Sequence, residues 1–147
     1  MISIRIEGIE ELRRKFERFP RQFQSALKTT LRASLDVLTE SVPPYPPQGA
    51  DVHYVRTGTL GRSIGSGQQG GRGGQPEIYD VQVGAKMSHA TWGTRLEYAP
   101  HVIGESQTRG AKKRGWYTIK VIAQKATQKI QQLFATFAEE LAQWLNE

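Results

Sequence analysis

The stretch TIKVIAQKATQKIQQLFATFAEELAQWL, residues 118–145, carries the strongest periodic pattern in the chain. Its apolar residues recur at steps of three and four, which is typical of the buried stripe of an amphipathic helix. Thr118 precedes this pattern and is a suitable N-cap, because its hydroxyl can accept a hydrogen bond from the first turn. The stretch therefore predicts a long C-terminal helix whose stripe is formed by Ile119, Ile122, Ala126, Ile130, Leu133, Phe134, Phe137, Leu141 and Leu145.

A second stripe lies nearer the N-terminus and predicts a helix of about 20 residues. It starts at Phe23 and ends before the proline-rich sequence PPYPP at 43–47, and its apolar residues are Leu27, Leu31, Leu35, Leu38 and Val42. Neither stripe can be buried without a partner surface. We therefore expect the two helices to pack together against one face of a sheet, with the four leucines against Ile130, Leu133, Phe137 and Leu141.

Alternating sequences predict the strands of that sheet. ISIRIE at 2–7 gives the first strand, and helical spacing then runs from Ile9 to Phe19 until Pro20 interrupts it. In EIYDVQVGA, Ile78 is out of phase with Val81, which indicates a bulge or a late start. Residues 90–104 predict a strand pair or a strand with a turn at Gly93.

This order of elements predicts an α+β fold in which an antiparallel sheet packs against a long N-terminal and a long C-terminal helix. The 147 residues suit a single domain, 1–147. The prolines predict a stiff linker at 43–53. Glycine-rich residues 65–76 and basic residues 105–115 predict mobile loops that become ordered or make contacts only on assembly.

Composition narrows the function classes. Without cysteine the chain has neither disulfides nor thiolate chemistry, and no stretch approaches the 18 apolar residues of a membrane span. The N-terminus lacks the pattern of a signal peptide, so we expect a cytoplasmic site of synthesis. The net charge of +6 favours polyanions or acidic protein surfaces as partners.

The chain contains no nucleotide-binding motif in the structural context that such a motif requires. GSGQQG at 65–70 has the spacing of a dinucleotide fingerprint, but GRGGQP follows it and cannot form the helix that would hold a pyrophosphate. RTGTLGRS at 56–63 has arginine where a P-loop has lysine, and lacks the first glycine of that motif. We expect no cofactor.

Catalytic and metal-binding patterns are equally absent. The three histidines, His53, His89 and His101, lie singly in different segments, and the carboxylates show no paired spacing. We therefore expect no catalytic site and no metal site, and interpret the chain as a non-enzyme.

The stretch YVRTGTLGRSI, residues 54–64, predicts a structural elbow between the helical half and the sheet. Gly58 permits a tight turn. Leu60 and Ile64 are one helical turn apart on one face, so Arg56 and Arg62 point outward.

Two short motifs stand out in the chain, TGxLxxSI at 57–64 and EYAPHV at 97–102. Their residues, with the glycine that follows the second motif, are Thr57, Gly58, Leu60, Ser63, Ile64, Tyr98, Ala99 and Gly104. The motifs resemble those of the neck proteins of long-tailed bacteriophages, the tail-completion or head–tail joining proteins that are also described as minor tail or virion morphogenesis proteins. The resemblance places the second motif on a strand before the closing helix.

The resemblance implies a homo-oligomeric ring, typically a hexamer, between the portal complex and the tail tube, with DNA passing through its channel. Its partners would be other neck and tail tube proteins, and its location the virion, after assembly in the host cytoplasm. The candidates for subunit interfaces or the DNA channel are Arg56, Arg62, Arg72, Arg109, Lys112, Lys113 and Arg114. The alternative is a small basic nucleic-acid-binding module outside any virion, which the single GGRGG around Arg72 also suits.

Overall fold

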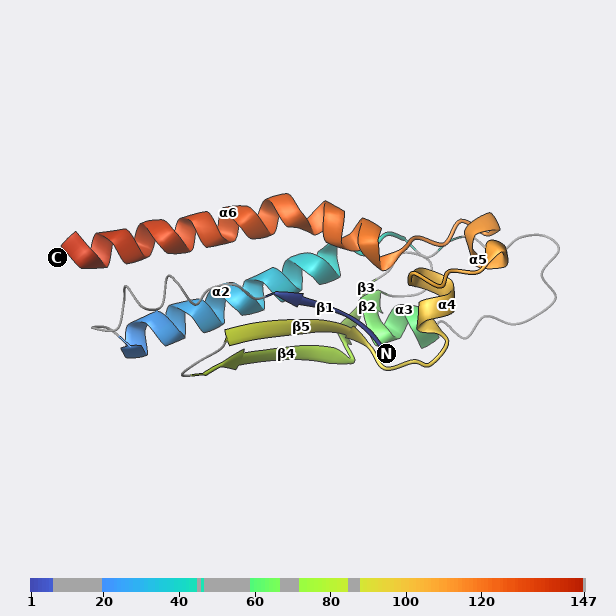
Figure 1. The fold of residues 1–147 in the computed structure, drawn as a ribbon, viewed down its shortest axis with the longest axis horizontal. Coiled ribbons are helices and arrows are strands. Elements are labelled where there is room, and N and C mark those ends of the chain that lie inside the picture. Colours follow the sequence, from blue (N-terminus) through green and yellow to red (C-terminus); the bar gives the residue numbers. More distant parts are fainter. Residues whose placement is uncertain (7–19, 45, 47–58, 67–71, 85–87, 147) are drawn as a thin grey trace.

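The computed structural model describes residues 1–6, 20–44, 46, 59–66, 72–84 and 88–146. Helix α2, Pro20–Glu40, lies between a three-stranded sheet and helix α6, Ile119–Asn146 (Figure 1). The predicted α+β class, with an antiparallel sheet and two long helices, is confirmed. The layers differ from the expectation in one respect, because α2 contacts the sheet while α6 packs mainly on α2.

The sheet joins the start of the chain to its middle. Strands β1, Ile2–Ile6, and β4, Ile78–Val83, flank β5, Ser88–Thr94, and both pair with it in antiparallel fashion. Ile4 and Tyr79 lie on either side of Trp92 in this register. Because side chains alternate between the two faces of a strand, Ile4, Tyr79 and the fully buried Trp92 share the face that α2 covers.

Two expectations about the strands are wrong. Strand β4 keeps an unbroken register from Ile78 to Val83, so it has neither a bulge nor a late start; Ile78 lies on the face opposite Val81. Gly93 is not at a turn but within β5, where a Cβ would overlap the carbonyl oxygen of Ile2. The second motif then forms a short helix, α4, Ala99–Ile103, instead of a strand.

Helix α2 begins at Pro20, the residue that interrupts the sequence pattern, because proline is tolerated in the first turn. Four of its hydroxyl groups, those of Thr29, Thr30, Ser34 and Thr39, donate to carbonyl oxygens four residues earlier in the helix. Fully buried Ser34 donates to the carbonyl oxygen of Thr30 at 2.9 Å, and Thr39 donates to that of Leu35 at 3.1 Å. These bonds let polar residues lie beside the leucine stripe.

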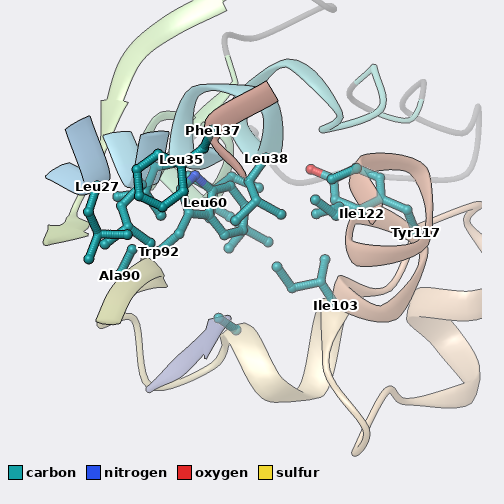
Figure 2. Close-up of a cluster of buried hydrophobic side chains, with 14 of the residues drawn as sticks. Leu27, Leu35, Leu38, Leu60, Ala90, Trp92, Ile103, Tyr117, Ile122 and Phe137 are labelled. Carbon is teal, nitrogen blue, oxygen red and sulfur yellow. The ribbon is translucent and has the colours of Figure 1, made fainter. Parts of the chain in front are cut away.

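Among the side chains that the structure describes, the core contains the two predicted stripes with one exception. Leu27, Leu31, Leu35 and Leu38 are at most 1% exposed, and so are Phe137 and Leu141. Phe23 and Phe137 bring their ring centroids to 5.7 Å. Leu133, by contrast, is half-buried and lies outside this cluster. Figure 2 shows Leu27, Leu35 and Trp92 on one side of the core and Ile103, Ile122 and Tyr117 on the other.

The elbow forms a short helix, α3, Thr59–Ser63, that leads directly into strand β2, Ile64–Ser66. β2 pairs with β3, Arg72–Pro76, in a second sheet of two strands. The prediction of a loop throughout 65–76 is therefore wrong at both ends. Glycines contribute no side-chain packing, but the pairing of β2 with β3 satisfies the hydrogen bonds of their backbone. Residues 67–71 lie outside the described residues, as do 47–53 of the expected linker and the expected helix at 9–19.

Candidate functional site

The first motif is a structural element where it is described. Leu60 and Ile64 are buried, and the Ser63 hydroxyl donates to the Leu60 carbonyl oxygen at 2.7 Å. Arg62 is exposed on the opposite side, as the helical spacing predicts. Arg56, Thr57 and Gly58 lie outside the described residues. Leu60 and Ile64 thus attach the elbow to the core, the Ser63 hydroxyl bonds within the elbow, and Arg62 faces solvent.

A carboxylate that the sequence did not single out connects this elbow to the second motif. Glu77 donates its backbone N–H to the Ser63 carbonyl oxygen at 2.8 Å. Its Oε2 accepts hydrogen bonds from the Thr94 hydroxyl at 2.9 Å and from the Arg95 N–H at 2.8 Å. Arg95 Nη1 returns a bond of 3.1 Å to the Glu77 carbonyl oxygen. Glu77 therefore fixes the turn that follows β5, through partners that only the fold brings near.

The second motif divides into buried and exposed residues. Ala99 is fully buried, and Gly104 lies so close to Pro100 that an added Cβ would be 2.7 Å from its Cα. The same Cβ would be 2.9 Å from Ile2 Cδ1, so the glycine lets α4 approach β1. Tyr98 is different, because its side chain is 46% exposed. Desolvation and the nearby Glu77 raise the pKa of the Tyr98 phenol above its ordinary value.

No protein-family model matches this chain. Neither a curated protein nor a solved structure shows significant similarity to it. Within the described ranges, no three histidine or acidic side chains gather as a metal site would require. No helix of the described part is long and apolar enough to cross a membrane.

The basic segment at 105–115 contains a short helix, α5, Arg109–Lys113, so the expectation of a loop is wrong there. Thr108 caps this helix by accepting a hydrogen bond from the Ala111 N–H at 3.2 Å. Ala111 is buried, which attaches the helix to the rest of the protein. The sequence signal that was missed is the pair of Thr108 and Ala111, spaced as an N-cap and the third residue of a helix.

A glutamine amide holds the two ends of this segment together. Gln107 Nε2 donates to the carbonyl oxygen of Val102 at 2.8 Å and to that of Trp116 at 3.0 Å. Thr108 N–H donates to the His101 carbonyl oxygen at 2.9 Å. Gly115 then reverses the chain with a φ of +84°, a value that favours glycine. The segment is thus tied to α4 on one side and to the start of α6 on the other.

The described basic candidates do not form one group. Arg62 is on α3 and Arg72 on β3, whereas the exposed side chains of Arg109, Lys112, Lys113 and Arg114 share α5 and its C-cap. α5 continues through 116–118 into α6, whose exposed Lys120, Lys125 and Lys129 were not among the candidates. They were missed because lysines scattered through a periodic helix resemble an ordinary solvent face.

Proposed function

We propose that the protein is a structural component of the phage neck, a tail-completion or head–tail joining protein that works as a ring of identical subunits through which DNA passes. The observation that carries the proposal is that the second motif contains both buried and exposed residues. Folding uses Ala99 and Gly104, while Tyr98 points to solvent. A motif residue that the subunit does not bury is available to an interface.

The surroundings of Tyr98 suit a contact between proteins. Glu77 holds the backbone of Arg95 just upstream, and the Tyr98 carbonyl oxygen accepts a hydrogen bond from the His101 N–H of α4 at 3.0 Å. The phenol therefore extends from an ordered backbone. Arg95, Glu97 and His101 around it are exposed. Tyrosine and arginine are enriched among the residues that contribute most to protein interfaces.

A second exposed apolar side chain lies at the same end of the sheet. Met1 is 76% exposed, and the following residue, Ile2, pairs with Thr94 just before the turn that leads to Tyr98. Met1 and Tyr98 are the large apolar residues that the described part of the chain leaves exposed. A closed ring needs two different complementary surfaces on each subunit, and this end of the sheet supplies one of them.

The test is the oligomeric state of the full chain and of Tyr98→Ser. Light scattering after size exclusion should find a ring for the native chain, and a monomer with native circular dichroism for the variant. Gln128→Ser changes an exposed residue in the middle of α6 and should leave the ring intact. A native chain that stays monomeric at high concentration and with its neck partners present would refute the proposal.

The alternative function, a basic nucleic-acid-binding module outside a virion, is favoured by one observation. From Ser106 to Ala138 the chain has no aspartate or glutamate. A strict monomer with salt-sensitive affinity for oligonucleotides would favour this alternative, because electrostatic attraction to phosphates weakens steeply with salt.

A further inference from the structure

We propose that α5 and the N-terminal half of α6 form one preformed cationic surface that binds the phosphate backbone of duplex DNA without reading its sequence. The inference rests on the proposed function, since it names the part of the subunit that meets the DNA. It extends the candidate surface from α5 onto α6, and it replaces the expectation of a loop that becomes ordered on binding.

The segment that contains α5 and the N-terminal half of α6 carries positive charges only. Residues 106–138 contain no acidic side chain and seven basic ones, namely Arg109, Lys112, Lys113, Arg114, Lys120, Lys125 and Lys129. All seven side chains are exposed. The nearest acidic residues along the chain are Glu105 and Glu139, at its two ends. An uninterrupted run of exposed cations is the electrostatic pattern of a phosphate-binding surface.

The proposed surface covers two neighbouring elements. α5 lies at the end of the molecule where α6 begins (Figure 1). At 3.6 residues per turn, Lys125 and Lys129 share one face of α6 and are roughly 6 Å apart along the axis, whereas Lys120 projects from the side opposite Lys129. That distance corresponds to roughly two base-pair steps of a duplex, at 3.4 Å each. The face that carries Lys125 and Lys129, together with the cations of α5, can therefore meet more than one phosphate.

The backbone of α5 is held in place by contacts within the subunit. Gln107 ties the start of the segment to the Trp116 carbonyl oxygen, Thr108 caps α5, and Ala111 is buried beneath it. The cations of α5 thus stand on a backbone that folding has already positioned. Binding needs to order their side chains only, which lowers its entropic cost.

The aromatic residues of this surface favour duplex over single-stranded DNA as its ligand. Single-strand binders stack bases on exposed aromatic rings. The aromatic residues within this surface are turned inward: Tyr117 is 8% exposed, and half-buried Trp116 packs against the core cluster. Their ring centroids lie 5.9 Å apart. Cations without an exposed aromatic platform favour contact with phosphates alone.

The experiment compares variants that lose the same charge at different places. Lys112→Gln with Lys113→Gln changes α5, and Lys125→Gln with Lys129→Gln changes α6. Arg21→Gln with Lys28→Gln is the matched control, because both residues are exposed on the N-terminal half of α2. Fluorescence anisotropy measures the affinity for a labelled duplex and for one of its strands over a series of salt concentrations.

We expect both test variants to bind the duplex more weakly and to lower the slope of log affinity against log salt by roughly 0.9 per lost contact. The control should keep the native slope, and the native chain should prefer the duplex to the single strand. Equal losses in all three variants would show a response to net charge alone and would overturn the proposal. So would tighter binding of the single strand, or an affinity for acidic protein but none for DNA.

Gln107→Ala tests the preformed state without changing any charge. We expect weaker duplex binding and faster proteolysis between 105 and 115, with the circular dichroism of the long helices retained. Native affinity together with faster proteolysis would refute the role of order. The mass of each variant in solution tests the ring separately from the DNA surface. A ring that does not bind duplex DNA would overturn only the proposed DNA surface. A monomer that binds duplex DNA would overturn only the proposed ring.

Discussion

The indole Nε1 of Trp92 donates a 3.0 Å hydrogen bond to the Thr39 hydroxyl oxygen, which connects the central strand β5 to α2. Thr39→Val keeps the shape of the side chain but leaves the fully buried indole without its acceptor. We expect a loss of about 1–3 kcal/mol in the free energy of unfolding, which urea titration would measure. Thr29→Val is the control, since its hydroxyl bonds only within an exposed part of α2. Equal stabilities of the two variants would contradict this role.

The packing of α2 against α6 predicts large effects at its centre. Leu31→Ala and Phe137→Ala should each lower the free energy of unfolding by about 2–5 kcal/mol, because both side chains are at most 1% exposed and leave a cavity. Leu133→Ala should cost clearly less, since Leu133 is half-buried and outside the core cluster. Chemical unfolding ranks the three variants. An unchanged midpoint for both Leu31→Ala and Phe137→Ala would refute this core.

Two glycines of the same region should respond in opposite ways to alanine. At Gly104 the new methyl group would collide with Pro100 and Ile2, so we expect a loss of about 1–3 kcal/mol. At Gly110, in α5, the nearest atom to that methyl is Thr108 Oγ1 at 4.0 Å, and alanine should be neutral or slightly stabilising. Thermal unfolding of the two variants tests both directions at once.

Stability should fall at alkaline pH through Tyr79. Burial and its 2.7 Å hydrogen bond to Asp36 raise the pKa of this phenol from 10.0 to about 12. The folded state therefore holds the proton more tightly than the unfolded state. Its contribution is complete below pH 10 and is lost between pH 10 and about 12. In Tyr79→Phe this part of the decline should disappear, and an identical pH profile in both proteins would contradict the assignment.

Replacement of Lys112, Lys113 and Arg114 by serine should leave the free energy of unfolding within about ±0.5 kcal/mol, because all three side chains are exposed. If the proposed function holds, the variant should still impair the joining of heads to tails or the passage of DNA. The measurement is the yield of infectious virions assembled with the variant. Normal yield and infectivity would contradict a role of these cations in the neck.

The periodic spacing of apolar residues within single segments was sufficient to predict the main elements of the chain. The two helical stripes and the alternation at 2–7 identified α2, α6 and β1, and Thr118 accepts the predicted capping bond from the Val121 N–H at 3.4 Å. These features depend on one segment at a time. The separation of the layers, with α2 between the sheet and α6, depends on which faces meet, and the stripes alone do not specify that.

The errors occurred where a short segment depends on a distant one. Gly93 resembles a turn residue, but its lack of a side chain serves the close approach of Ile2. Residues 72–76 are rich in glycine and still form a strand, because β2 pairs with them. Glu77 has no local sign of importance, since its carboxylate partners lie at Thr94 and Arg95. The motif identified Tyr98 and Ala99 alike, and only the structure shows that Tyr98 is exposed whereas Ala99 is buried.

The position of α2 between two layers has a consequence for synthesis on the ribosome. β1 is synthesised before α2, yet it pairs with β5 at residues 88–94. Helix α6, which covers the other side of α2, is completed only at residue 146. The leucine stripe of α2 is therefore made long before either surface that buries it. Contacts so distant along the chain slow folding, and exposed apolar surface promotes aggregation. A chain truncated before α6 should need a chaperone to stay in solution, whereas the chain of 147 residues should not.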